Sequence, residues 1–310
     1  MRNITNVYEA VGSNKLKSNL VMLFFTAFVV GVVWVFAYTF GYGPEMIGYA
    51  LVFSGLMAFA SYWYSDKIIL GISQARPANR KKDFHFYTVT ENLSLATGIP
   101  MPKLYVIDDT ATNAFATGRD PKHAVVCATT GLLEKLDRTE LEGVIGHELS
   151  HIGNYDIRLM SIVTVLAGLI VLLSDWMFRV SAHSNRDEDN KAGGVLMIVG
   201  FVLVLLSPII AQLIKLAISR RREFLADASS AKLTRYPEGL ARALEKIAKD
   251  KEPLEAANKA TAHLYITNPF KDDVGGAKRS GEQGRTHWFA GLFNTHPPVE
   301  DRIRALRSMA

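Results

Sequence analysis

The chain has 310 residues, of which 49% are hydrophobic and 21% charged, and its formal net charge is +5. This modest charge, gathered at the ends of apolar runs, argues against nucleic-acid binding, and no P-loop pattern for a nucleotide is present. The single cysteine, Cys127, excludes an intrachain disulfide and a cysteine-rich zinc site, and its apolar surroundings predict a buried thiol. The length allows one soluble domain of about 150–200 residues beside a membrane anchor.

Four apolar runs are each long enough to cross a bilayer as a helix; the third is the weakest prediction, because Asp175 lies near its end. A hydrocarbon core of about 30 Å requires roughly 20 helical residues. A cleaved signal peptide fits the first run poorly, because the run is too long and a second follows at once. A buried hairpin of a soluble protein is the alternative for the last two runs, and their length argues against it. The predicted spans are residues 20–40, 46–64, 159–180 and 192–214.

Basic residues flank these runs on one side of the predicted membrane. They are Lys15, Lys17, Lys67, Arg76, Arg80, Lys81, Lys82, Lys215 and Arg220 to Arg222. The turn between the first two runs carries only Glu45, and residues 186–191 between the last two are net negative. Because cytoplasmic segments of membrane proteins are enriched in lysine and arginine, both termini and the soluble part are predicted to be cytoplasmic.

Outside the runs, hydrophobic periodicity and turn residues predict a soluble unit of helices and strands. The predicted helices are residues 91–97, 131–136, 219–248 with a break at Pro237, and a terminal helix after Pro298; the predicted strands are 104–107, 113–116 and 124–128; residues 271–286 are a predicted loop, and 288–293 a predicted core contact.

The resulting organisation has four parts. Residues 1–65 are an N-terminal segment with the first hairpin, and residues 159–214 are the second hairpin. Residues 66–158 and 215–310 are the two cytoplasmic catalytic parts that these hairpins separate.

Residues 147–151 read His-Glu-Leu-Ser-His, a metalloprotease motif. Each residue of an α-helix turns by about 100°, so His147 and His151 project from one face, one turn apart. Two imidazoles in this arrangement can bind one Zn²⁺, with Glu148 beside them to act on water. The alternative is a chance pentapeptide on an amphipathic helix. Both histidines border the apolar side of the predicted helix, which favours the zinc site.

Local signals mark both ends of the motif helix. Asp137 and Glu140 have the spacing of a capping box, in which each side chain binds the other residue's backbone N–H. Gly153 and Asn154 provide a helix stop. The motif is therefore predicted to lie on a helix that begins near residue 138 and ends near 153.

A catalytic zinc site needs three protein ligands and an open position, and Glu223 is the best candidate for the third. His151 lies 8 residues before the third predicted span and Glu223 lies 9 after the fourth. At 1.5 Å per residue, both would lie about 12–13 Å beyond the hydrocarbon, on the same side. Asp227, one turn after Glu223, is placed to hold a ligand histidine. The alternative for Glu223 is a solvated acid beside three arginines.

Other histidines could also provide the third ligand. His183 fits poorly, because the predicted topology places it on the opposite side of the membrane. His263, His287 and His296 remain possible ligands on the residue pattern alone.

Four motifs in this order resemble the HtpX-type membrane zinc metalloproteases, relatives of the CAAX prenyl protease of the endoplasmic reticulum. They are Asn113–Ala116, His147–His151, Glu223–Asp227 and Thr295–Pro298, with one hairpin before the motif helix and one after it. The resemblance covers nearly the whole chain. It implies that His147, His151 and Glu223 bind one zinc ion, Glu148 is the catalytic acid and base, and Asp227 supports a ligand.

The resemblance also implies roles for two further residues. His296 is the candidate for stabilising the oxyanion, because a Thr-His-Pro-Pro turn would hold it rigidly; the alternative is a histidine that caps the last helix. Asn113 resembles the edge-strand asparagine that hydrogen-bonds a substrate added as a strand, and the alternative is a turn-closing asparagine.

The expected fold is mainly α. Four transmembrane helices carry a cytoplasmic zincin-like α+β metalloprotease domain, whose zinc-ligand helices continue into the membrane helices. The resemblance implies the bacterial inner membrane as the location of this multi-pass protein. The expected partners are the lipid bilayer and membrane-protein or unfolded polypeptide substrates, with no nucleic acid and no nucleotide.

The expected function is zinc-dependent cleavage of membrane proteins on the cytoplasmic side; the resemblance implies that the substrates are misfolded or damaged proteins, in stress response and quality control. A non-catalytic zinc-stabilised scaffold is one alternative, and it would not require Glu148 or leave an open metal position. Processing of prenylated peptides is another, and four spans are few to enclose the chamber that it needs.

Overall fold

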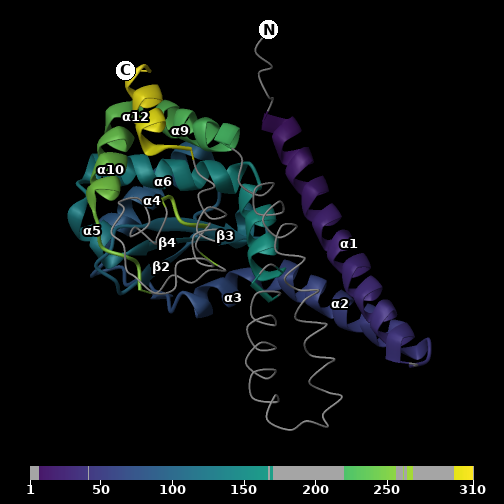
Figure 1. Ribbon diagram of the computed structural model, residues 1–310. Coiled ribbons are helices and arrows are strands. Elements are labelled where there is room, and N and C mark those ends of the chain that lie inside the picture. The colour runs from purple at the N-terminus through teal and green to yellow at the C-terminus, as the bar shows by residue number, and fades with distance from the viewer. Residues whose placement is uncertain are drawn as a thin grey trace, which may run out of the picture.

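Figure 1 shows the computed structural model, which describes residues 7–40, 42–166, 168–169, 220–255, 261, 264–267 and 297–309. Most of the predicted second hairpin, the predicted loop 271–286 and the patch 288–293 lie outside the described residues. The helices are α1 (Val7–Phe40), α2 (Glu45–Trp63), α3 (Ser65–Ile72), α4 (Phe84–Thr97), α5 (Thr130–Lys135), α6 (Arg138–Gly153), α9 (Arg220–Thr234), α10 (Pro237–Lys249) and α12 (Val299–Arg307), with the short 3₁₀ helix η1 (Pro121–His123). Residues 156–166 are also helical.

Helices α1 and α2 are long and pack against each other, and they contain the first two predicted spans. Among the residues that the structure describes, α2 is the one helix long and apolar enough, by length and composition, to cross a membrane. Its large apolar side chains are mostly exposed, and they include Leu51, Val52, Phe53, Leu56 and Phe59. An apolar surface of this extent is typical of a helix that meets lipid or a partner.

A four-stranded sheet lies at the centre of the remaining chain, in the order β1-β2-β4-β3. The strands are β1 (Arg76–Pro77), β2 (Lys103–Ile107), β3 (Ala114–Gly118) and β4 (Ala124–Thr129). Strands β2 and β4 are parallel, while β1 and β3 run antiparallel to their neighbours. Strand β3 is therefore an edge strand, yet all five of its residues are buried.

Alternating residues of β4 contact two different cores, because successive side chains of a strand point to opposite faces. Val126 and Ala128 belong to a core completed by α4, α6, α10 and α12. Val125 and Cys127 belong to a second core, with side chains from α1, α3 and residues 159–166. Cys127 is buried as predicted, and burial raises the pKa of its thiol. The sheet thus lies between two helical layers (Figure 1).

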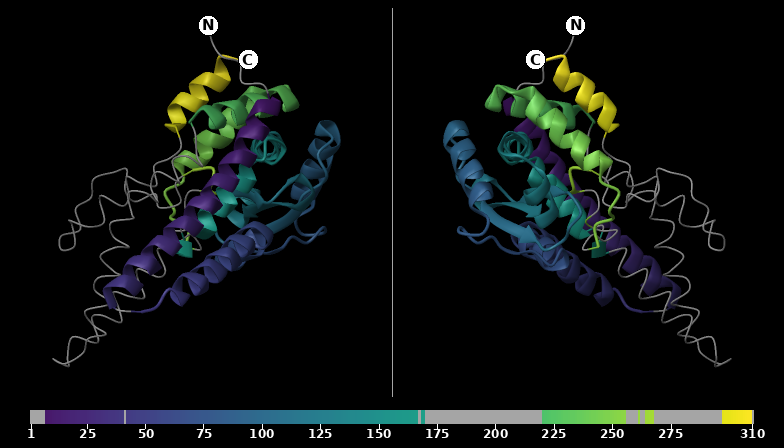
Figure 2. Two further views of the ribbon diagram at one scale, coloured as in Figure 1. Left: turned by 90° about the vertical axis from the view of Figure 1, so that its right-hand side faces the viewer. Right: turned by 90° about the vertical axis from the view of Figure 1, so that its left-hand side faces the viewer.

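The last helices lie at the end of the molecule opposite to α2. Figure 2 shows α12, in yellow, packed beside α9 and α10, in green. Helix α6 packs against both α9 and α10. This arrangement brings the C-terminal part of the chain onto the helix that carries the His-Glu-x-x-His motif.

Most predicted elements are confirmed, with shifts of one or two residues; α4 is longer than predicted, and α3, η1 and β1 were not predicted. Helix α4 starts at Phe84, seven residues before its predicted start. Phe86, Val89 and Leu93 form a buried helical stripe against the first core, so tertiary packing extends the helix. Strand β1 was not predicted, because its two residues are too few for a period-2 pattern.

The structure contradicts one part of the predicted fold. Helix α6 ends at Gly153 and is capped by Asn154, and Tyr155 has a positive φ of 59° before the next helix begins. A non-glycine residue in this left-handed conformation interrupts the right-handed helix. The prediction that the zinc-ligand helix continues unbroken into a membrane helix is therefore wrong for α6. The residues before α9 lie outside those described.

Candidate metal centre

Helix α6 begins and packs as its sequence dictates. The Asp137 carboxylate accepts the Glu140 N–H at 2.9 Å, and the Glu140 carboxylate accepts the Asp137 N–H at 2.9 Å, which completes the predicted capping box. A β-carbon at Gly143 would lie 2.7 Å from the Leu240 backbone, so only glycine allows this approach of α10. At Gly146 it would lie 2.8 Å from the Ser230 hydroxyl of α9. Small residues thus let α9 lie close against α6.

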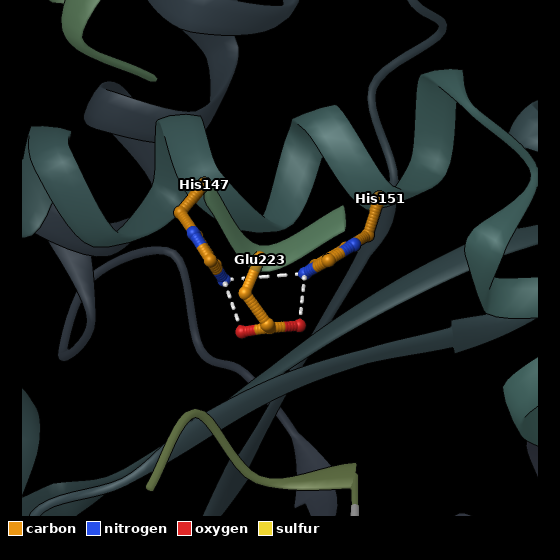
Figure 3. Close-up of side chains that lie close together, drawn as sticks. All are labelled: His147, His151 and Glu223. Atoms are coloured by element: carbon orange, nitrogen blue, oxygen red, sulfur yellow. Dashed lines mark hydrogen bonds and ion pairs between the residues drawn. The ribbon is translucent and has the colours of Figure 1, made fainter. Parts of the chain in front are cut away.

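This close packing brings three side chains together, and Figure 3 shows them pointing toward one another. His147 and His151 come from α6 and Glu223 from the first turn of α9. The two histidine Nε2 atoms are 3.2 Å apart. One Glu223 oxygen lies 3.8 Å from Nε2 of His147, and the other lies 3.6 Å from Nε2 of His151. All three residues are buried.

The spacing of these atoms fits a metal ion. Two ligands about 2.1 Å from a tetrahedral zinc lie roughly 3.4 Å apart, close to the separations between His147, His151 and Glu223. The ligand atoms of the three residues lie within 4.8 Å of one another. The donor set of two imidazoles and one carboxylate is that of catalytic zinc sites with an open fourth position.

Each histidine is also held on its far side by a carboxylate, as metal-ligating histidines usually are. Nδ1 of His147 lies 2.9 Å from the Asp227 carboxylate, so the predicted support by Asp227 is present in the geometry. Nδ1 of His151 lies 3.0 Å from the carboxylate of Asp156. These contacts leave both Nε2 atoms facing Glu223.

Arg302 of α12 completes the support of Asp227, and sequence reasoning missed it. Its Nε and Nη2 donate to the two carboxylate oxygens of Asp227 at 2.8 and 2.6 Å. Its Nη1 lies 3.7 Å from the Glu223 carboxylate. Burial alone would raise the pKa of Asp227, but Arg302 lowers it to about 2. A fully buried arginine has to be paired, yet nothing near Arg302 in the sequence distinguishes it from its exposed neighbours.

Asp156 is a second residue that sequence reasoning missed. Its other oxygen accepts a hydrogen bond from the Asn14 side chain of α1 at 2.7 Å. Arg222 lies beside this pair, with Nη1 3.4 Å from the same oxygen. Among the described residues around the two histidines, carboxylates outnumber basic side chains. The carboxylates are Glu148, Asp156, Glu223 and Asp227, and the basic side chains are Lys17, Arg222 and Arg302. This excess of negative charge favours a bound cation.

Glu148 lies beside the cluster without joining it. It is buried, and a small pocket is lined by Glu148, both histidines, Ala116 of β3, Met160, Leu264 and Ile266. Burial raises the pKa of Glu148 to about 7, with the nearby charge of Glu223 acting in the same direction. A carboxylate with this pKa can both accept and donate a proton near neutral pH.

The chain itself occupies the free edge of β3. The Ile266 N–H donates to the Ala114 carbonyl at 3.0 Å, and the Asn113 side-chain amide donates to the Thr267 carbonyl at 3.2 Å. These are the two kinds of contact that an added strand would make. Asn113 is therefore at the predicted place on the sheet edge, and residues 264–267 are its present partner.

Four of the histidines considered in the sequence analysis lie outside the described residues. They are His183, His263, His287 and His296. The predicted roles of His296 in stabilising the oxyanion and of Asn113 in binding substrate stay predictions.

Comparisons with known proteins identify the family of the chain. Residues 81–310 match the sequence profile described as "Peptidase family M48". The chain is similar to three proteins named "Protease HtpX homolog". The one from Dictyoglomus thermophilum is 46% identical (97% of this chain, 94% of the relative), the one from Caldanaerobacter subterraneus is 41% identical (98% of each chain), and the one from Thermococcus sibiricus is 43% identical (92% of this chain, 93% of the relative).

A solved structure titled "Crystal Structure of S. mikatae Ste24p" aligns with a TM-score of 0.47 and 20% identity, over 96% of this chain and 67% of that one. This likeness is too distant to carry a functional assignment. The family match and the curated relatives confirm the resemblance to HtpX-type proteases and the prediction of a metalloprotease. The chain belongs to peptidase family M48.

Proposed function

We propose that this metalloprotease binds one zinc ion per chain through His147, His151 and Glu223. The observation that carries the proposal is the convergence of these three buried side chains from two helices, at separations that suit a tetrahedral ion. Asp227 and Asp156 hold the two imidazoles so that both Nε2 atoms face Glu223, where they would bind the ion.

Hydrolysis of a peptide bond follows from the neighbouring residue. When bound, zinc supplies a water of lowered pKa and polarises the scissile carbonyl. Glu148 takes the proton from the attacking water and passes it to the leaving amine. Burial raises the pKa of Glu148 and a bound cation would lower it again, which leaves a carboxylate suited to both steps. His296 remains our candidate for the donor that stabilises the oxyanion.

Substrate is proposed to bind as an added strand at the edge of β3, with Asn113 binding its backbone. Residues 264–267 now make these contacts, so a substrate would have to displace them or extend the edge beyond them. In either case the substrate has to be extended, and folded transmembrane helices are poor substrates.

The membrane placement is also a proposal. Helix α2 and residues 20–40 of α1 would be the first two of four spans, with both termini on the cytoplasmic side. At the end of α2, Trp63 and Tyr64 line a cavity together with Lys67 and Arg119. The Arg119 guanidinium lies 4.4 Å from the Trp63 ring centre. Aromatic and basic side chains gathered at a helix end support a membrane–water boundary at this level.

This placement would hold the metal centre near the bilayer surface. Only Asn154 and Tyr155 separate α6 from the helix that begins at residue 156, where the third predicted span follows. We therefore propose that the enzyme cuts juxtamembrane cytoplasmic segments of misfolded or damaged membrane proteins in the bacterial inner membrane. This activity would serve quality control and stress response.

Three measurements test the proposal. Metal analysis of purified protein should find one zinc per chain, and a casein-type assay should show proteolysis that a chelator stops and added zinc restores. Cleavage sites on a model membrane substrate should lie in extended segments close to the bilayer. Cuts inside transmembrane spans, or only in distant soluble domains, would contradict the proposed substrate preference.

A further inference from the structure

A polar residue of the N-terminal helix reaches the metal centre. Asn14 of α1 is buried, and its side-chain amide donates to the Asp156 carboxylate at 2.7 Å and to the Asn154 carbonyl at 2.9 Å. It lies 142 residues from Asp156 in the sequence. It also precedes residue 81, where the match to peptidase family M48 begins.

The contacts of Asp156 are divided between its two oxygens. Oδ1 accepts from Asn14 and lies near Arg222, while Oδ2 lies 3.0 Å from Nδ1 of His151. The Arg222 Nη1 also donates to the side-chain oxygen of Asn14 at 3.0 Å. Asn14 thus uses both ends of its amide in one network with Asp156 and Arg222.

The network has a direct consequence for the metal ligand. A carboxylate can rotate about its terminal torsion, which is broad and weakly restricted. The hydrogen bond from Asn14 holds one oxygen of Asp156 in place, and so directs the other toward His151. Because the His151 ring is oriented by that second oxygen, the position of its Nε2 depends on Asn14.

We propose that Asn14 is a positioning residue of the metal centre, which acts on His151 through Asp156. The N-terminal helix is then part of the metal site and not only an anchor. This inference rests on the zinc site proposed above. The other hydrogen bond of the Asn14 amide, to the carbonyl of Asn154, also caps the end of α6.

A purely packing role for Asn14 predicts different behaviour. If Asn14 only filled space between α1 and residue 156, its replacement would change the stability of the protein but not its affinity for zinc. In the positioning role, Asn14→Asp keeps the shape but replaces the N–H donor with a negative oxygen beside Asp156. That change would turn an attraction into a repulsion in a buried place.

The test uses the full-length protein, purified in detergent, with zinc affinity measured by competition with a chelator. Asn14→Ala should weaken zinc binding by about tenfold, which is the low end of the effect expected when a residue that supports a metal ligand is removed. Asn14→Asp should weaken zinc binding by at least as much. Ser18→Ala is the matched control. Ser18 is buried one turn further along α1, and its hydroxyl donates only to the Asn14 backbone carbonyl among the described contacts. Its zinc affinity should stay within about twofold of wild type.

Two more readouts separate positioning from stability. The visible absorption of cobalt-substituted protein should shift in both Asn14 variants and not in Ser18→Ala, at equal thermal stability. The double variant Asn14→Ala/Asp156→Asn should bind zinc no more weakly than Asp156→Asn alone, because both changes act on one path.

Each result decides between the two roles. Wild-type zinc affinity in folded Asn14→Ala would overturn the inference. It would also be overturned if Asn14→Ala bound zinc more weakly while Asn14→Asp kept the wild-type affinity. Additive losses in the double variant would also overturn it. A wild-type chain that binds no zinc would instead refute the proposed metal site, so the two failures are distinguishable.

Discussion

Arg302 of α12 and Asp227 of α9 form a buried, bidentate ion pair, with two hydrogen bonds of 2.8 and 2.6 Å. The pair lies directly behind His147, whose Nδ1 is 2.9 Å from the same carboxylate. A fork of two parallel N–H donors fixes the plane of a carboxylate better than a single donor can. The last helix of the chain therefore helps to fix the orientation of a proposed metal ligand.

The first prediction concerns this pair. Arg302→Met removes the partner of a buried carboxylate, and the loss should be about 3–5 kcal/mol of unfolding free energy. The thermal midpoint in detergent measures it. Arg304→Met is the matched control, because Arg304 lies on the same helix with its side chain 80% exposed. Equal midpoints in the two variants would show that the buried pair does not contribute to stability.

Glu148→Gln should abolish peptide hydrolysis and keep zinc. Glutamine preserves the shape but cannot accept the proton, and such acid–base roles contribute roughly 10²–10⁴-fold to the rate. Zinc content and casein cleavage are measured on the same preparation. Activity within about tenfold of wild type would show that another group is the base.

Glu223→Ala should lose zinc and activity together, because it removes one of three ligands. Asp227→Ala should weaken zinc binding by roughly 10–100-fold without removing a ligand. Metal analysis after dialysis against a weak chelator separates the two. One zinc per chain in Glu223→Ala would rule out its role as ligand.

The activity should fall on the acid side of neutrality. Glu148 works as a base only when it is deprotonated, so activity is present above its pKa and is lost below it. Burial raises that pKa to about 7, and a bound cation would lower it again. We expect an acidic limb in kcat/KM with an apparent pKa at or below about 7. A profile that is flat down to pH 4 in a folded enzyme would contradict this assignment.

Topology can be tested by reporter fusions after residues 120, 187 and 300. The distribution of lysine and arginine predicts cytoplasmic, external and cytoplasmic signals respectively. An external signal at residue 120 would invert the orientation and place the metal centre outside the cytoplasm.

The sequence by itself determined the local parts of this protein. Helix α6 has its start, its stop and both histidines within one continuous stretch, and one turn of helix places those histidines on the same face. The sequence also predicted the break between α9 and α10 at Pro237, because proline cannot continue the hydrogen bonding of a helix interior. Glu223 was the best candidate for the third ligand because a zinc site requires one, although His263, His287 and His296 stayed possible on the residue pattern alone.

Only the tertiary structure decided what supports those ligands. Arg302 and Asp227 are 75 residues apart, and Asn14 and Asp156 are 142 apart. Arg302 belongs to a short helix rich in charged residues, where solvent exposure is the usual expectation. Asn14 lies among polar residues before an apolar run. A polar side chain can be buried only where a hydrogen-bond partner offsets the cost of removing it from water. Here the packing of distant helices provides that partner, so the sequence alone does not reveal it.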